Sequence, residues 1–513
     1  MRLSNSLKNI STGILASIII AILGFISRKI FLDSLGAEYL GINGLLTNIL
    51  AMLALVESGI GTSIVYNLYK PLAENDRPRI IALIQLYKKA YSILALIILI
   101  LSLILFPFLD FFIRESETIP YLSVAYFIFV SKNLFTYLNA HRVSLINADQ
   151  KGYILTNINT IFQIVMTIAK IVVLILTKNY LLFLLIDLTI FGIQTIIYGR
   201  LVGKRYSYIK TTEKHYLNNR EKQNLVKNIK ALFLHNIGSF CVNGTDYILI
   251  SMYVGIVTVG QYSNYTMILG QVTALIASIL GGIGASVGNL IAVESKEKSF
   301  SIFNITYLVN FWIYSISVIF LYNLLNPFIR WWLGEEYLLD SLTFIIILIN
   351  FYLIGLRGSI STFKNKAGIF VQDKYVPLIE AVINLAASII LVNFIGLPGI
   401  FIGTLLSTLC IVFWNVPRLV YKYVFNVSVW LYFKKYVYYL VLTIVVGFVT
   451  TFICKSLIPN GNLLSLVGKG IICIVVPNII YVVLFYKSQE FIYIKTMLSR
   501  VIPRLKIKIN SAS

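Results

Sequence analysis

The chain is a succession of long apolar runs separated by short polar segments. Many of these runs reach about 20 residues, the length at which a helix crosses the hydrocarbon core of a bilayer. We count about 14 of them. They lie near residues 10–32, 40–67, 90–112, 119–139, 153–176, 180–199, 231–254, 262–291, 301–325, 339–361, 377–395, 399–417, 436–457 and 464–486. The pattern predicts an all-α polytopic membrane protein with about 14 transmembrane helices.

The composition supports this class. Of the 513 residues, 58% are hydrophobic and 12% are charged, which is more apolar surface than a soluble core of this size requires. The tyrosines between Tyr421 and Tyr439 are expected to form a belt at the membrane interface. The four cysteines lie inside apolar runs without a paired spacing, so we expect buried small residues rather than a disulfide or a metal site. They are Cys241, Cys410, Cys454 and Cys473.

The positive charges are concentrated on one side of the predicted membrane. With the N-terminus in the cytoplasm, about 33 of the 43 lysines and arginines fall on the cytoplasmic side, as the positive-inside rule requires. The longest polar loop, near residues 200–230, and the C-terminal tail are both basic. We therefore expect both termini to be cytoplasmic. Anionic membrane lipid accounts for the net charge of +22, so no nucleic-acid partner is expected.

A weak internal repeat divides the chain. The stretches LGAEYLGINGLLT and YVGIVTVGQYSNYT align at an offset of about 219 residues, with Gly36 over Gly255 and Gly41 over Gly260. From this repeat we infer two pseudo-symmetric six-helix bundles followed by an extra helix pair. The inferred parts are a first bundle at 1–200, a basic cytoplasmic linker at 201–230, a second bundle at 231–425, and two extra helices with a basic tail at 426–513.

Ionisable residues inside the predicted spans are the candidates for function, because a charge in hydrocarbon is costly and needs a partner or water. Structural roles remain open for several of them. Lys29, Lys170 and Asp187 lie within reach of an interface, where they could cap a helix or extend towards water. Lys132 and Arg357 could also extend to an interface, and a structural ion pair is equally compatible with Glu57. The candidate substrate site consists of Arg28, Lys29, Glu57, Lys132, Lys170, Asp246, Arg357 and Glu380.

The buried cations in this set outnumber the buried acids. This balance predicts a central cavity of net positive charge, which selects an anionic headgroup because phosphate oxygens accept charge-assisted hydrogen bonds from arginine and lysine. A proton- or sodium-driven exporter of cationic drugs would show the opposite balance. The sequence contains no Walker A motif, metal-ligand spacing, nucleophile elbow or dinucleotide motif. We therefore predict transport rather than an enzyme, with no catalytic residue, metal or cofactor.

Four local motifs carry a resemblance to a known family. They are SRKIF (Ser27 to Phe31), LGAEYLGINGLL (Leu35 to Leu46), ESGIGTSIVYNLYKPLAEND (Glu57 to Asp76) and GQYSNYTMI (Gly260 to Ile268). With the count of spans, they resemble a Wzx-type flippase of the polysaccharide transporter family. The same superfamily contains exporters of the multidrug and toxin extrusion type and the lipid II flippases.

The resemblance implies a V-shaped pair of bundles that alternates between inward-open and outward-open forms. The implied cargo is an undecaprenyl-diphosphate-linked oligosaccharide, moved to the outer leaflet of the bacterial plasma membrane for capsule, exopolysaccharide or O-antigen synthesis. Glycosyltransferases and a polysaccharide polymerase are the implied partners besides membrane lipid, and the family's arginine in the first span falls on Arg28. A lipid II flippase and a cation-coupled multidrug exporter are the alternatives. The absence of arginine from the second span disfavours the former, and the absence of an acid before Asp33 disfavours the latter.

Overall fold

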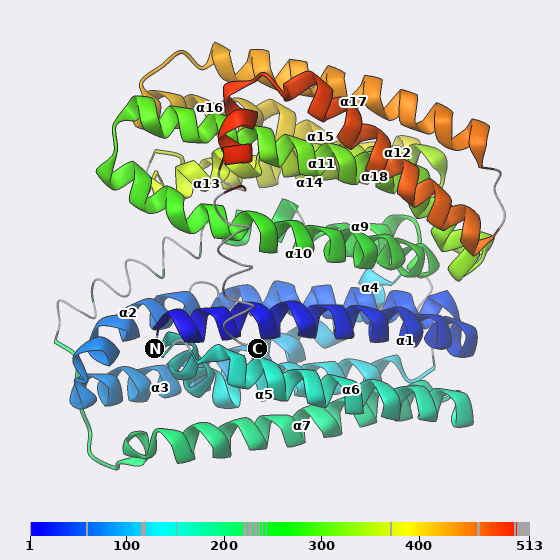
Figure 1. Cartoon of the computed structure of the whole chain (residues 1–513). Coiled ribbons are helices and arrows are strands. Elements are labelled where there is room, and N and C mark those ends of the chain that lie inside the picture. Colours follow the sequence, from blue (N-terminus) through cyan, green and yellow to red (C-terminus); the bar gives the residue numbers. More distant parts are fainter. Residues whose placement is uncertain are drawn as a thin grey trace, which may run out of the picture. The chain divides into compact units, whose positions relative to one another are not determined.

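The protein is helical along almost the whole described chain. The computed structural model describes residues 2–57, 60–113, 120–149, 151–218, 244–369, 372–458 and 462–496, with isolated positions between 223 and 242 and at 499. These parts contain no strand (Figure 1). Ten helical stretches within them are long and apolar enough to cross a membrane. The predicted all-α membrane fold is confirmed.

The first of two compact units is Met1–Ser263. Within it, α5 packs on α3 and α7, while α6 packs on α1 and α7 (Figure 1). Asn179 caps α7 by accepting a hydrogen bond from the Leu182 amide at 3.1 Å, so α6 and α7 form a tight antiparallel hairpin. The helices are α1 (Arg2–Leu53), η1 (Ala54–Glu57), α2 (Ile60–Glu74), α3 (Arg77–Leu105), η2 (Phe106–Phe108), α4 (Leu109–Phe112), α5 (Leu122–Ala148), α6 (Gly152–Thr177), α7 (Tyr180–Arg205), η4 (Ser207–Lys210), α9 (Asp246–Tyr253) and the start of α10 (Ile256–Val293).

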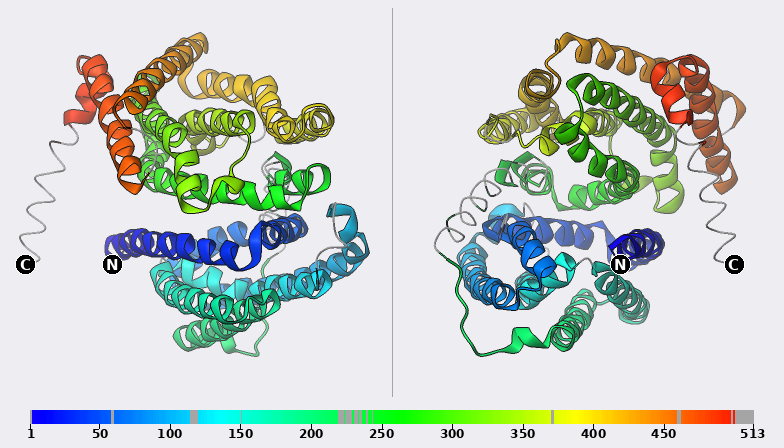
Figure 2. Two further views of the ribbon diagram at one scale, coloured as in Figure 1. Left: turned by 90° about the vertical axis from the view of Figure 1, so that its right-hand side faces the viewer. Right: turned by 60° about the vertical axis from the view of Figure 1, so that its left-hand side comes forward.

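The second unit is Asn264–Ser513. Its long helix α11 packs against α12 and against the C-terminal pair α17 and α18, which lie side by side (Figure 2). Two π-helical turns flank α16, and such turns rotate the side chains that follow them relative to a regular helix. The elements are the rest of α10, α11 (Lys296–Trp332), η5 (Glu335–Tyr337), α12 (Ser341–Leu356), α13 (Gly358–Lys366), α14 (Val376–Ile395), α15 (Leu397–Ser407), η6 (Thr408–Val412), α16 (Phe413–Val420), η7 (Tyr421–Phe425), α17 (Trp430–Leu457) and α18 (Leu463–Phe485).

The difference between about 14 predicted spans and ten observed stretches has identifiable causes. One stretch, Leu15–Glu57, contains the first predicted span and the start of the second. Two helices join there at Gly36 without a loop between them. The backbone of Gly36 is not helical, with φ of 86° and ψ of 177°. The fourth and eighth predicted spans are α5 and α10, and α5 is less apolar because it carries Lys132 and several amide side chains. The seventh is interrupted by residues outside the described ones, and its continuous described helix, α9, has only eight residues.

The first copy of the predicted repeat lies against the part of the second copy that belongs to the first unit, residues 253–263. Gly36 and Gly255 both have positive φ, at 86° and 138°, so each copy bends at its matching glycine. A Cβ on Gly41 would lie 2.0 Å from the Ile256 carbonyl oxygen, and a Cβ on Gly260 would lie 2.1 Å from that of Ala37. Ala37 and Ile256 also correspond under the repeat, so the contact is reciprocal, as in a two-fold interface.

Most tyrosines of the expected interfacial belt are buried instead, although Tyr423 and Tyr438 are 49% and 50% exposed. Tyr421, Tyr432 and Tyr439 are buried in the aromatic core of the second unit, where Tyr439 stacks on Phe311 with ring centroids 4.1 Å apart. Tyr421 lies on η7, whereas Tyr432 and Tyr439 lie on α17. Stacked and edge-to-face rings of this kind stabilise a core beyond the apolar area that they bury.

Candidate functional site

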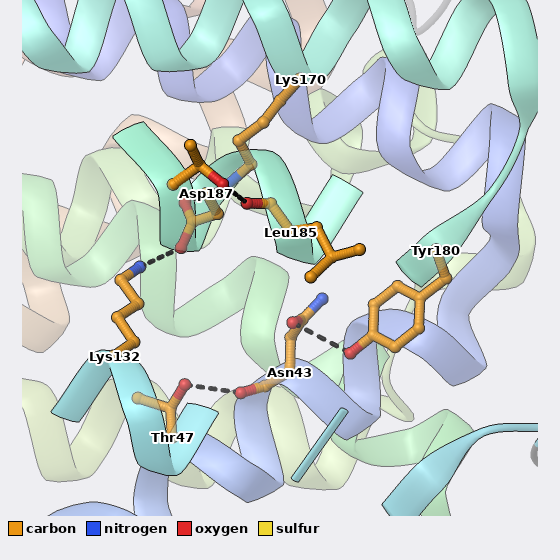
Figure 3. Close-up of polar contacts among 8 residues, drawn as sticks. Asn43, Thr47, Lys132, Lys170, Tyr180, Leu185 and Asp187 are labelled. Atoms are coloured by element: carbon orange, nitrogen blue, oxygen red, sulfur yellow. Dashed lines mark hydrogen bonds and ion pairs between the residues drawn. The ribbon is translucent and has the colours of Figure 1, made fainter. Parts of the chain in front are cut away.

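Two lysines share one buried carboxylate in the first unit. Lys170 of α6 donates a hydrogen bond to Asp187 Oδ1 at 2.8 Å, and Lys132 of α5 donates to Asp187 Oδ2 (Figure 3). The side chains of Lys132, Lys170 and Asp187 are 37%, 18% and 10% exposed, so Lys132 is the most open of the three. We call these three residues the Asp187 cluster. With both lysines protonated, the cluster has one positive charge that no carboxylate within it balances.

The Asp187 cluster lies away from the ends of α6 and α7. Asp187 is seven residues after Tyr180, the first residue of α7, and Lys170 is seven residues before Thr177, the last of α6. At about 1.5 Å per residue, both lie about 10 Å from the same end of the hairpin. Asp187 does not cap α7, whose N-cap is Asn179, and instead forms an ion pair with Lys170.

Each lysine of the Asp187 cluster also makes a cation–π contact with an aromatic ring. Lys170 lies over the Phe183 ring with 4.2 Å from Nζ to the ring centroid, and Lys132 lies 5.6 Å from the centroid of Phe191. Such cation–π contacts are stronger where water is excluded. Phe183 is in turn fixed next to Tyr180, whose hydroxyl donates to Asn43 Oδ1 at 3.2 Å (Figure 3). The second part of α1 therefore helps to position the cations.

Arg28 and Lys29 are neighbours in the sequence but lie in different environments. Arg28 donates a hydrogen bond from Nη1 to Ser263 Oγ at 2.8 Å, which ties α1 to the start of α10. Lys29 pairs with Asp33 one turn away at 3.1 Å, and both side chains are largely exposed. Exposed pairs of this spacing contribute little to stability. The structure therefore places Arg28 inside the unit and Lys29 on its surface.

The other two candidate acids of the first unit, Glu57 and Asp246, are hydrogen-bonded by tyrosines rather than paired with cations. Glu57, at the end of η1, accepts hydrogen bonds from the hydroxyls of Tyr91 and Tyr137. Asp246, at the start of α9, accepts a hydrogen bond from Tyr262 at 3.3 Å, and its Oδ1 atom has no partner among the described residues. Neither acid forms an ion pair in the described structure, so the structural ion pair considered for Glu57 is not observed there.

The second unit brings Arg357 and Glu380 together. Arg357 Nη1 lies 3.9 Å from Glu380 Oε1 and has no hydrogen-bond partner within the described chain. A second pair, Lys364 with Asp373, is buried nearby and interacts electrostatically with the first. These four charges balance, so this site differs from the Asp187 cluster in having no surplus cation.

An apolar groove of about 800 Å³ runs along the second unit. Side chains of α11, α12, α15 and α17 line it, and almost all of them are apolar. Its polar groups include Tyr352, which bonds Thr443 at 2.9 Å, and Tyr436, whose buried hydroxyl has no partner among the described residues. Tyr436 also lies within electrostatic range of Arg357. The groove can hold an apolar chain with a polar group at the tyrosine end.

Sequence reasoning located most of these charges but missed several partners. Capping a helix or extending to an interface was an open alternative for Asp187, which in the structure joins the two lysines. Lys364 and Asp373 are not among the candidate residues, yet both are buried. Buried tyrosines around Glu57 and Asp246 have no sequence signal beyond their helical position. In the part of the chain that the structure describes, no group of three or more histidine, cysteine or acidic side chains could hold a metal ion.

Known structures with a similar fold are membrane transporters. The chain is similar to a lipid II flippase, MurJ, in an inward closed conformation, with a TM-score of 0.66 and 16% identity over 92% of this chain and 98% of that one. It is also similar to an inward-facing multidrug resistance transporter of the MATE family and MOP superfamily, with a TM-score of 0.53 and 14% identity over 76% and 92% of the two chains. At these identities the likeness establishes the fold.

No curated protein sequence matches the chain significantly. The profile of a family described as polysaccharide biosynthesis protein, in contrast, matches residues 6–283, which is more than half of the chain. The matched part includes the Asp187 cluster, Arg28, Glu57 and the two repeat copies. This multi-pass membrane protein therefore belongs to the polysaccharide biosynthesis protein family.

Proposed function

We propose that the protein is a flippase for an undecaprenyl-diphosphate-linked oligosaccharide repeat unit. It moves this lipid from the inner to the outer leaflet of the bacterial plasma membrane by alternating access, for capsule, exopolysaccharide or O-antigen synthesis. The observation that carries the proposal is the surplus cation of the Asp187 cluster. A positive charge deep in the membrane is costly unless it meets an anion, and the diphosphate is the anionic part of such a substrate.

Two further features support a lipid substrate. Arg28 lies inside the same unit as the Asp187 cluster and adds a second place for a phosphate oxygen. The apolar groove of the second unit suits a polyprenyl chain, because its lining is apolar and its tyrosine end lies near Arg357. We further propose that both termini are cytoplasmic and that glycosyltransferases and a polymerase act on either side of the transport step.

The first test is the pool of lipid-linked oligosaccharide in a deletion strain, resolved by leaflet with mass spectrometry. We expect a complete repeat unit on undecaprenyl diphosphate to accumulate in the inner leaflet while surface polymer disappears, because the transport step alone is blocked. Reintroducing the intact gene should reverse both changes. An unchanged pool with normal surface polymer would refute the proposed function.

A cation-coupled exporter is the second candidate, because Glu57 is a buried acid held by two tyrosines. The variants Arg28→Ala and Glu57→Gln separate the candidates. We expect Arg28→Ala to reduce polymer export by about tenfold or more, since a charge-assisted hydrogen bond contributes about 1.5–3 kcal/mol. The exporter hypothesis predicts the larger loss for Glu57→Gln, measured as drug efflux. Normal export by both variants would exclude both residues from the site.

A further inference from the structure

Two buried cysteines meet between the last two helices. Cys454 of α17 and Cys473 of α18 are 19 positions apart, and their sulfur atoms lie 3.7 Å from each other. They are 1% and 0% exposed. Both are buried and free in this structure, as the sequence predicts, but the sequence does not predict that they lie together. Sequence spacing gave no sign of it, because the contact forms across a helical hairpin.

The surroundings hold the two thiols in place. Leu324, Phe320 and Phe328 of α11 and Leu466 of α18 pack around them. The Cys454 sulfur also lies 4.0 Å from the backbone oxygen of Lys469, one turn before Cys473. The two thiols therefore face each other within a cluster of apolar side chains. The other two cysteines differ, because Cys241 is only partly buried and Cys410 is exposed.

We propose that Cys454 and Cys473 are a dithiol pair that forms a disulfide and thereby links α17 to α18. A disulfide has a sulfur–sulfur distance of about 2.05 Å, so the two sulfur atoms, now 3.7 Å apart, must move closer to form it. The oxidant is a disulfide of another thiol compound. One cysteine thiolate attacks it and forms a mixed disulfide, releasing one thiol; the second thiolate then attacks the cysteine sulfur of that bond and releases the other thiol. Two protons leave the pair, and its two electrons reduce the oxidant.

The place of this exchange follows from the topology. The turn between α17 and α18 lies on the outer side in the predicted orientation, where disulfides persist. Because the folded hairpin covers both thiols, the exchange takes place before α18 packs fully against α17 and α11. The bond then fixes the pairing of the two helices that follow the second predicted bundle.

The test is differential alkylation of the full-length protein in membranes. Cells are quenched with acid, the protein is denatured in detergent with one maleimide, and it is then reduced and treated with an isotopically heavy maleimide. We expect Cys454 and Cys473 to carry the heavy label, while Cys241 and Cys410 in the same chain carry the light one. In Cys473→Ser, the remaining Cys454 should switch to the light label.

A second experiment tests whether the pair can form a disulfide independently of the redox conditions during growth. Isolated membranes are unfolded mildly, treated with oxidised glutathione and refolded before labelling. Cross-linked peptides containing Cys454 and Cys473 should then be found in nearly all molecules. Light label on both cysteines in both arms, at the level of Cys241, would overturn the proposal.

Discussion

Replacing Gly41 with alanine should prevent the folded protein from accumulating in the membrane. The added Cβ would lie 2.0 Å from the Ile256 backbone oxygen, a distance that real side chains do not adopt, and backbone cannot move aside as a side chain can. The two helices would have to separate, at a cost of about 3 kcal/mol. Close packing through small residues is a principal source of helix association in membranes, so little would replace it. Gly260→Ala should have the same effect, since its Cβ would lie 2.1 Å from the Ala37 oxygen.

The measurement is the amount of monodisperse protein after detergent extraction, read through a fluorescent fusion. The matched control is Gly270→Ala on α10, where an added Cβ meets no heavy atom within 4 Å. We expect this variant to equal the natural protein or exceed it slightly, because alanine favours helix over glycine. Equal yields of Gly41→Ala and Gly270→Ala would contradict the close crossing.

Replacing Lys170 with methionine should reduce export by more than about tenfold while the protein still folds. The substitution keeps the length and apolar contacts of the side chain but removes the surplus charge of the Asp187 cluster. Asp187 retains Lys132 as a partner, so no carboxylate is left buried alone. The readouts are surface polymer per molecule of transporter and the level of the transporter itself. Lys70→Met on α2 is the control, since the Lys70 side chain is 73% exposed.

Two further variants separate charge from structure in the cluster. Asp187→Asn leaves two buried lysines without a carboxylate, and removing one member of a buried pair costs about 3–5 kcal/mol, so the protein level should fall. The double variant Asp187→Asn with Lys170→Met returns the cluster to one net positive charge. We expect it to recover protein level and part of the export lost in Lys170→Met. Full export by Lys170→Met alone would show that the surplus charge is not used.

Much of the fold was predictable because its signals are local in the sequence. Apolar runs gave the positions of the helices, and the repeat gave the glycines at which both copies bend. The partners of buried charges were not predictable in the same way. Asp187 lies 17 residues from Lys170 and 55 from Lys132, and sequence does not tell which helices are neighbours. The pair of Cys454 and Cys473 was missed for the same reason.

For the tyrosines between Tyr421 and Tyr439, the sequence pattern was clear but led to a largely incorrect prediction. A cluster of tyrosines and tryptophans after a transmembrane run is typical of a membrane interface. Here η7 continues the helix beyond Pro417, and Tyr421 and Tyr432 are almost fully buried. A π-helical turn depends on packing around it, which an aromatic-rich segment alone does not reveal. The segment therefore contributes several buried tyrosines to the core, while Tyr423 and Trp430 remain exposed.

The lysines of the Asp187 cluster are fixed to α5 and α6, so their charge remains with the protein when a bound anion departs. With the proposed diphosphate as that anion, each completed cycle carries negative charge outward. In a cell whose interior is negative, this direction is downhill by about 2.3 kcal/mol for each charge per 100 mV. Under the proposed function, the resting membrane voltage would therefore favour outward transport, with the lysines as a stationary counter-charge for the anion in the low-dielectric interior.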